Sequence, residues 1–427
     1  MNGQKLPLLL FISQFLFQAS LMGQQKIILS DLRDAALKSS TQMSQQTLTD
    51  QSLKINNALA KIGYLPKLSL GGTASYQTDV TTLPISFPGV EIPSPQKDQY
   101  KVSLDLQQTI YDGGATRAGL AMNAANAHLE SVKVIYDKQK ILELTDQLFY
   151  GGLSLQIQSE NLSILENQLE QKLAKVNENI SQGTMSKLSA SQIKVKLIEL
   201  SQQQEMLKAK STSTKQTLGL LTGINLSDTD IFELQETAST MSKKEYASPE
   251  INLLLAQQSL VSAADALTDA KFAPKLSLNA SLAYGRPGLN FLSRDFDTYG
   301  LASLQLRIPI DHFYTKQKMH EKALNQLKMD AIDDQLTNAR RGINIKLQNI
   351  EADIAQLENT IVKDQELLEL RQDIAKTIEV QYDNGIITER DYLEELENVN
   401  VARNNMALHK IQLAQAIDQW KLLIGNF

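Results

Sequence analysis

The chain has 427 residues, of which 42% are hydrophobic, so it carries enough apolar side chains for a sizeable core. Its formal net charge of -6 argues against a nucleic-acid partner, because binding nucleic acid calls for a basic surface. The absence of cysteine excludes disulfides, thiolate metal sites, cysteine nucleophiles and a lipid-carrying cysteine behind a signal sequence.

The first 23 residues have the pattern of a secretory signal peptide. Lys5 precedes an apolar run from Leu6 to Phe17, and small residues follow up to Gly23. The run is too short for a spanning helix, and no other stretch reaches the roughly 18 apolar residues that such a helix needs. We therefore expect cleavage of residues 1–23, with a buried first helix as the alternative. If the protein crosses a membrane, strands must do so.

A short motif, PKLSL, begins at Pro66 and again at Pro274. Apolar and polar residues alternate after both copies, which in a strand places them on opposite faces. Strands are predicted at 64–80, 100–111, 274–284 and 299–310. Because the two copies are about 200 residues apart, we expect two repeats of one unit, 24–223 and 248–427, joined by a segment of mixed signals at 224–247.

Helical spacing of apolar residues fills most of the remaining chain. Helices are predicted at 28–62, 115–182, 186–221, 248–271, 314–383 and 388–427. Gly183 and Gly385 end the two longest, so each long helix forms an antiparallel hairpin with the helix that follows it. The longest helices would reach about 100 Å, and the shorter ones must stack end to end beside them.

Four strands are too few to close a barrel, and open sheet edges are not tolerated in lipid. The predicted barrel must therefore be shared between chains, and two, three or four copies all give an even number of strands. The polar rows would face the barrel lumen and carry Lys67, Asp105, Lys275 and Arg307. Four tyrosines near the strand ends, namely Tyr76, Tyr100, Tyr284 and Tyr299, are predicted to lie at the membrane interfaces.

The order of these elements and several local motifs resemble the TolC-like outer-membrane efflux proteins. The motifs are both copies of PKLSL, LQQTIYDGG at 106–114, LRIPID at 306–311, QGTMSKLSASQ from 182 and YDNGIITERDYLEELENV from 382. The resemblance implies an α+β membrane protein that forms a homotrimer. It implies a twelve-stranded β-barrel continued by a long periplasmic α-helical barrel of coiled-coil hairpins.

The resemblance also implies a function, which is passive export through the outer membrane of a Gram-negative bacterium. The trimer would be the exit duct of a tripartite efflux or type I secretion system, carrying small molecules or proteins. Its partners would be a periplasmic adaptor protein, an inner-membrane RND or ABC transporter, and outer-membrane lipid. The cargo and the class of transporter are not specified by the sequence.

The resemblance also implies that acidic residues constrict the periplasmic end of the tunnel. Asp391 and Glu394 occupy the matching positions after Gly385. They are three residues apart on a helix and so share a face, and three copies would form a carboxylate ring that attracts cations. The alternative is a solvated acidic face, because Glu389, Glu395 and Glu397 are close by.

The family's closed form uses an ion pair that this chain lacks. In this chain Ile387 stands where the basic partner would be, and Ser189 stands where the acidic partner would be. The ion pair is therefore absent or is rebuilt, with Lys187 or Arg390 as candidates. The tip residues as a set either dock an adaptor hairpin or pack the hairpin ends. They are Gly183, Thr184, Met185, Leu188, Gly385, Ile386 and Ile387.

The remaining motifs predict neither an enzyme nor a cofactor site. The histidines are scattered, and Gly113–Gly114 and Gly151–Gly152 lack the phosphate-binding pattern and its lysine. The second glycine pair lies within a helix, where it permits close packing or a bend. Two other functions stay open: a periplasmic adaptor, which should show one hairpin where this chain has two, and a structural coiled-coil envelope protein, which leaves the strands unexplained.

Overall fold

The computed structural model describes residues 26–82, 89, 94–235, 248–291, 293–310 and 312–426. The predicted signal peptide and residues 236–247 of the predicted linker lie outside these ranges. The chain divides into two compact units. The tip unit comprises Met1–Ala35, Thr145–Ala238 and Asn359–Gln412, and the sheet unit comprises Ala36–Leu144, Ser239–Glu358 and Leu413–Phe427.

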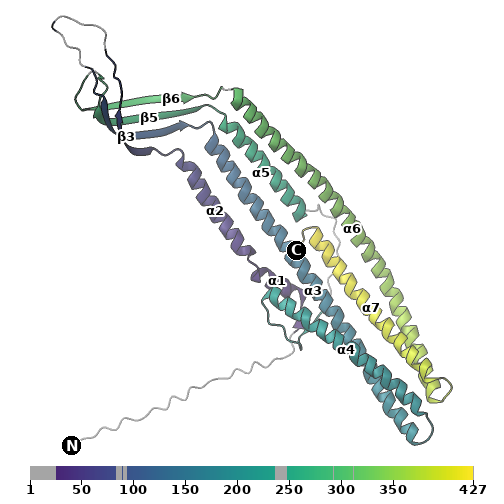
Figure 1. The fold of residues 1–427 in the computed structure, drawn as a ribbon. Helices are drawn as coiled ribbons and strands as arrows, with labels where there is room; N and C mark the ends of the chain where they lie inside the picture. Colours follow the sequence, from purple (N-terminus) through teal and green to yellow (C-terminus); the bar gives the residue numbers. More distant parts are fainter. Residues whose placement is uncertain are drawn as a thin grey trace, which may run out of the picture. The chain divides into compact units, whose positions relative to one another are not determined.

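Helices make up most of the described chain (Figure 1). They are α1 (Leu29–Ser39), α2 (Gln42–Ile62), α3 (Ala115–Ser181), α4 (Lys187–Thr222), α5 (Pro249–Lys271), α6 (His312–Asp383) and α7 (Glu389–Leu423). Among the described helices, none has an apolar stretch that would let it cross a bilayer. The predicted single helix over 28–62 is wrong, because the helix is interrupted at Ser40 and Thr41. There the Ser40 hydroxyl donates to the Leu37 carbonyl at 2.7 Å.

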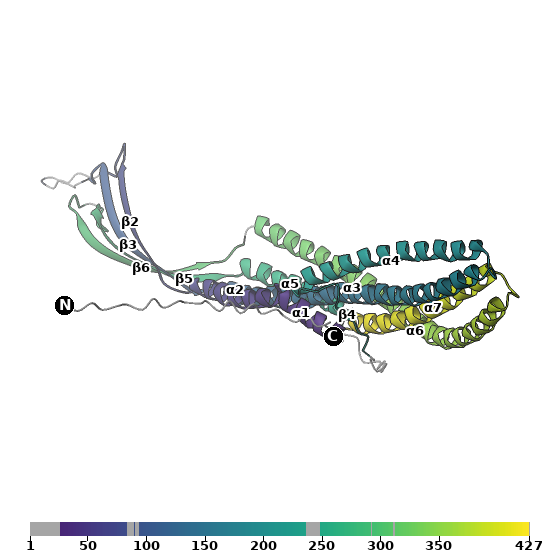
Figure 2. The ribbon, with the colours of Figure 1, turned by 90° about the horizontal axis from the view of Figure 1, so that it is seen from below.

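The sheet unit contains a four-stranded antiparallel sheet in the order β2-β3-β5-β6. Its strands are β2 (Lys67–Tyr76), β3 (Asp98–Tyr111), β5 (Lys275–Arg286) and β6 (Asp297–Arg307), and Figure 2 shows the curvature of the sheet. The register aligns the apolar rows, since Leu70 is opposite Leu104 and Leu104 is opposite Leu282. One face is therefore apolar and the other polar, and β2 and β6 are the two edges.

The helices of the sheet unit have their own core. Ile343, Leu347 and Ile354 of α6 pack against Ile417 and Trp420 near the end of α7. These residues follow helical spacing on α6, which is why one stripe of the helix is buried.

The junction of β3 and α3 is fixed by the carboxylate of Asp112. It accepts hydrogen bonds from the Tyr64 hydroxyl at 2.8 Å and from the backbone N–H groups of Gly114 and Thr116 at 2.9 and 2.7 Å. Gly113, between them, has a φ of 74°, and a Cβ atom there would lie 2.7 Å from the Cβ of Ala273. The junction therefore requires glycine at this position.

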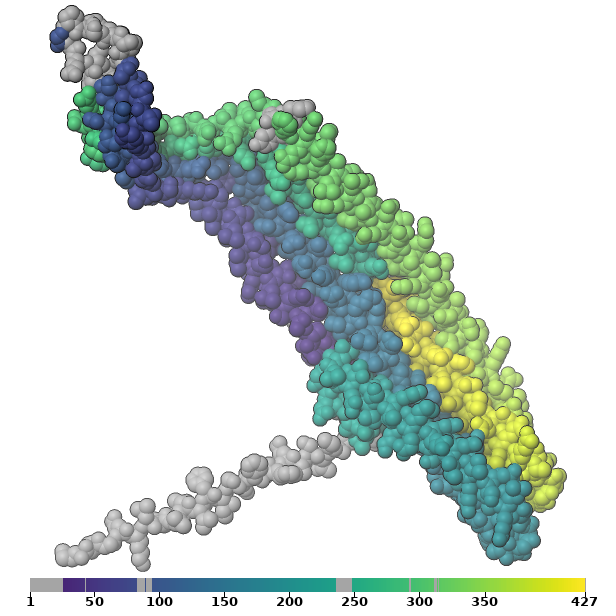
Figure 3. Space-filling view, in the orientation of Figure 1, coloured from purple at the N-terminus to yellow at the C-terminus, as the bar shows by residue number. Residues whose placement is uncertain are grey.

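The tip unit is formed by the second half of α3, by α4, by the end of α6 and by the first part of α7. Its core combines Leu165, Leu169 and Val176 of α3 with Ile193 and Leu200 of α4, and it includes two tyrosines described below. In the space-filling view the atoms of α4 (teal) and α7 (yellow) come together toward the hairpin ends (Figure 3). Leu165, Leu169 and Val176 are four and seven residues apart along α3, so they lie on one stripe of the helix, and this accounts for the packing of their side chains.

Two very short strands were missed by the sequence prediction. β1 (Lys26–Ile27) and β4 (Ile231–Phe232) form a parallel pair within the tip unit. The Phe232 ring lies against Gly152, where an added Cβ atom would be 2.6 Å from the ring. The backbone N–H of Phe232 donates to the Gln156 side chain at 2.7 Å. Of the two roles expected for the glycine pair, Gly152 therefore has the role of close packing.

Candidate functional site

The two hairpin tips have the same turn geometry. Gly183 and Gly385 have φ values of 78° and 70°, which are left-handed conformations that favour glycine after a helix. At the first tip the backbone N–H of Thr184 donates to the Asn179 carbonyl at 3.0 Å. At the second, the backbone N–H of Ile386 donates to the Gln381 carbonyl at 2.9 Å. The turns therefore end α3 and α6 as the glycines predict.

The four apolar side chains at the tips divide into two pairs. Met185 and Ile387 pack against the core of the tip unit. Leu188 and Ile386 are 65% and 70% exposed. The sequence left open whether the set packs the hairpin ends or forms a docking surface; in the structure the first pair is partly buried in packing and the second pair is exposed.

Asp391 and Glu394 both lie exposed on α7, three residues apart. Asp391 also caps its helix: its carboxylate accepts from the Thr388 hydroxyl at 2.6 Å and from the Thr388 backbone N–H at 3.1 Å. The Asp391 backbone N–H donates back to the Thr388 hydroxyl at 3.3 Å, completing a capping box. These hydrogen bonds from Thr388 hold the pKa of Asp391 below its usual value.

Glu394 lines a groove of about 520 Å³ between α4 and α7. Leu188, Val195 and Leu393 supply its apolar wall, and Arg390 lies at its side. The groove joins an exposed tip residue to one of the two predicted constriction residues.

A buried cluster beside the tips was missed by sequence reasoning. The Lys172 side chain of α3 is only 4% exposed, and its Nζ lies 4.6 and 4.5 Å from the ring centroids of Tyr382 and Tyr392. These two rings stack on each other at 5.0 Å. Lys172 also donates to Asp383 at 2.7 Å, and the more exposed Lys175 donates to the same carboxylate at 2.8 Å.

This cluster connects the two hairpins, because Lys172 and Lys175 belong to α3 and Asp383 to α6. Partial burial raises the pKa of Asp383, but the hydrogen bonds from the two lysines outweigh it and lower the pKa overall. Among the residues that the structure describes, neither Lys187 nor Arg390 forms an ion pair. Neither residue therefore replaces the missing ion pair of the closed form within one chain. A second connection between the hairpins is the ion pair of Lys196 on α4 with Glu397 on α7.

Glu389, the first residue of α7, is the unusual carboxyl group of this region. It is 6% exposed, and the Tyr382 hydroxyl donates to its Oε2 atom. Its Oε1 atom has no hydrogen-bond partner in the described part of the chain. Burial raises the pKa of Glu389 to about 7, and the nearby Lys172 only partly opposes this. The sequence indicated only an ordinary solvated acid here.

The sheet places the four predicted lumen residues on one face. By register, Lys67 is opposite Gln107, Asp105 is opposite Ser281, and Lys275 is opposite Arg307, all in the polar rows. The Asp105 carboxylate accepts from the hydroxyls of Ser103 and Ser281 at 2.8 and 2.6 Å. Their grouping on a single face follows from strand periodicity.

The four predicted interfacial tyrosines do not form one set. Tyr76, Tyr100 and Tyr284 lie in the apolar rows, but Tyr299 is opposite Ala283 and lies in the polar rows. Tyr299 therefore lies on the opposite face of the sheet from the other three, because in a strand one residue of offset reverses the face. The sequence missed Phe296, whose ring stacks with those of Tyr100 and Tyr284 at 6.3 and 5.6 Å.

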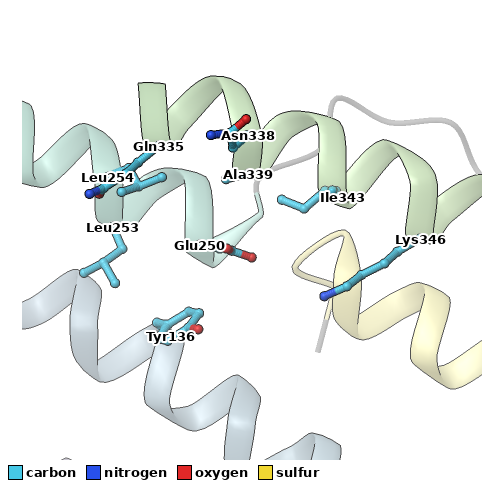
Figure 4. Close-up of a pocket in the computed structure, with 10 residues that line it drawn as sticks. Tyr136, Glu250, Leu253, Leu254, Gln335, Asn338, Ala339, Ile343 and Lys346 are labelled. Carbon is cyan, nitrogen blue, oxygen red and sulfur yellow. The ribbon is translucent and has the colours of Figure 1, made fainter. Parts of the chain in front are cut away.

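A pocket of about 480 Å³ lies between α3, α5 and α6 in the sheet unit (Figure 4). Tyr136 of α3, Glu250 of α5 and Lys346 of α6 supply its polar groups, and Leu253 and Ile343 supply apolar contacts. The pocket therefore combines one phenol, one carboxylate and one ammonium group, each from a different helix.

Comparison with solved structures finds the same fold at low sequence identity. The CmeC outer membrane channel of Campylobacter jejuni matches with a TM-score of 0.69 and 17% identity, covering 93% of this chain and 86% of that one. The outer membrane protein VceC of Vibrio cholerae matches with a TM-score of 0.67 and 15% identity, covering 93% of this chain and 96% of that one. The open state of the Neisseria gonorrhoeae MtrE outer membrane channel matches with a TM-score of 0.66 and 13% identity, covering 93% of this chain and 88% of that one. A scan against protein-family models and a search of curated proteins give no match.

Proposed function

Since this chain has the fold of the outer-membrane channels of the TolC-like family, we propose that it is itself an outer-membrane exit duct. The duct would serve a tripartite efflux or type I secretion system. The observation that carries the proposal is a sheet with one apolar face, one polar face and two free edges, joined directly to long helical hairpins.

The free edges support a barrel shared between chains. β2 and β6 run antiparallel to each other, because three antiparallel pairings separate them, so β6 of one chain can pair with β2 of the next in the same antiparallel sense. The strands have 10, 14, 12 and 11 residues, long enough for tilted strands that span an outer membrane. We propose a homotrimer with twelve strands; the number three rests on the resemblance to the family.

Transport through such a duct is passive. A periplasmic adaptor would join it to an inner-membrane RND or ABC transporter, which supplies the energy. The exposed Leu188 and Ile386 at the tips are our candidates for the adaptor contact. Asp391 and Glu394 are our candidates for the acidic constriction at the periplasmic end, and the channel would export small molecules or proteins. The four predicted lumen residues would line the barrel.

The test is the mass of the detergent-extracted protein together with its single-channel conductance in a planar bilayer. We expect a particle of three chains, each of 47.5 kDa less the signal peptide, with small cation-preferring currents. A monomer or dimer without channel activity would reject the proposal.

A further inference from the structure

Three cations lie toward one end of the polar face of the sheet: Lys275 and Arg307 are directly opposite each other, and Lys67 is two strands from Lys275. Lys67 is the first residue of β2, Lys275 the first of β5, and Arg307 the last of β6. Since β2 and β5 run opposite to β6, all three positions lie at the end where the strands join the helices. The register also places them in the polar rows.

Lys275 and Arg307 are directly opposite each other on neighbouring strands. Like charges in this arrangement destabilise a sheet, unless an anion compensates them. In the described part of the chain none of the three cations forms an ion pair. Asp105, on the same face, accepts hydrogen bonds from two serine hydroxyls, and Asp112 accepts them from Tyr64 and two backbone N–H groups; among the described residues neither carboxylate forms an ion pair with the three cations.

We propose that Lys67, Lys275 and Arg307 form an anion-binding belt inside the barrel, and that small anionic solutes are a class of cargo which this belt concentrates. The inference rests on the proposed function, because only a closed ring of chains brings the copies of the belt to face one another. A narrow lumen walled by a low-dielectric sheet strengthens the attraction of such a belt for counter-ions. Its charge is opposite to that of the exposed acids Asp391 and Glu394 at the hairpin tips.

The test is current block by citrate in a planar bilayer containing the full-length protein. Citrate is added on the side of the sheet loops, so that it reaches the belt without passing the hairpin tips. We expect a voltage-dependent block at low ionic strength that weakens as salt screens the charges. The triple variant Lys67→Gln/Lys275→Gln/Arg307→Gln should weaken the block at least about tenfold.

A matched pair of single variants locates the effect. Lys275→Gln removes one charge from the belt, and Lys101→Gln removes one charge from the same face further toward the loops. We expect relief of the block with Lys275→Gln and little change with Lys101→Gln. These single variants also carry the test if the triple variant does not assemble.

The outcomes separate the two proposals. Channels that form normally but show equal citrate block in wild type and Lys275→Gln would overturn the belt alone, as would equal relief by Lys101→Gln. The complete absence of channels in the wild type would reject the proposed function, and the belt with it.

Discussion

Glu389 should make the stability of the tip depend on pH. Its pKa is about 7 in the folded chain, against an ordinary value of 4.5, because burial disfavours the ionised form. Between these two values the folded state holds the proton more tightly than the unfolded state, so stability falls as pH rises. We expect the Tm of the detergent-solubilised protein to drop between about pH 5 and pH 8.

The variant Glu389→Gln removes this titration. At pH 8 this variant should have a higher Tm than the wild type. Its Tm should also depend less on pH, because the amide of Gln stays neutral. Glu394→Gln is the control, because Glu394 is exposed on the same helix. Parallel profiles for the wild type and Glu389→Gln would contradict this account.

Asp391 caps α7 and is also a candidate for the constriction, so its two roles need separating. We expect Asp391→Asn/Glu394→Gln to raise conductance at low calcium and to reduce cation selectivity, because a carboxylate ring attracts cations. Single-channel recording with a salt gradient measures both.

Thr388→Ala is the matched control for the capping role. It removes the hydroxyl of the capping box, at a cost of about 1 kcal/mol, and leaves both carboxylates in place. If Thr388→Ala alters selectivity as much as the double variant does, the effect comes from the helix cap and the constriction proposal fails.

At the scale of the elements, the pair Lys172–Asp383 should hold α3 and α6 together. Asp383→Asn leaves the buried ammonium of Lys172 without its counter-ion, a change that typically costs about 3–5 kcal/mol. We expect faster hydrogen exchange of backbone amides near both tips and a higher open probability of the channel.

An exposed ion pair on the same helix provides the comparison. Asp373 pairs with Lys376 at 2.9 Å, and their side chains are 74% and 76% exposed. Because exposed pairs contribute about 0–1 kcal/mol, Asp373→Asn should leave exchange at the tips unchanged. Equal effects of the two variants would show that the buried pair has no special role.

Sequence patterns predicted the regular elements well where a local signal marks them. Gly183 and Gly385 gave the ends of α3 and α6, and strand alternation gave the two faces of the sheet. The break at Ser40 and Thr41 was missed because neither glycine nor proline marks it. β1 and β4 were missed because two residues are too few to show a period.

The candidate site was harder to predict from sequence for a physical reason. Lys172 and Asp383 are far apart in the chain, and no local pattern links them. Glu389 and Asp391 are two residues apart and look alike in sequence, yet one is buried and the other exposed. Burial of this kind depends on which helices pack together, so only the tertiary structure distinguishes the two acids.

For the whole molecule, the faces of the sheet give a direct test of the proposed membrane orientation. Leu70 is 77% exposed in the apolar rows, and the neighbouring Ser69 lies on the polar face. Leu70→Lys would place a charge against lipid, at a cost of about 2–4 kcal/mol near the bilayer midplane. Ser69→Lys would place the same charge toward the lumen.

We therefore expect Leu70→Lys to reduce the amount of oligomer extracted from the outer membrane, and Ser69→Lys to leave it near the wild-type level. Quantitative extraction followed by native electrophoresis measures both. The reverse order of the two variants would assign the polar face to lipid and contradict the proposed barrel.

The exposure of β2 has a genetic consequence. All ten of its residues are exposed in the single chain, so neither face of this edge strand is covered before chains associate. Under the proposed assembly, a chain would complete its folding only together with its neighbours. A subunit whose β6 can no longer pair with a neighbouring chain would still have a β2 that can. It would then be incorporated beside normal subunits, and the ring would stay open at its β6. Such an allele should be dominant over the wild type when both are expressed, whereas an allele that yields no protein should be recessive.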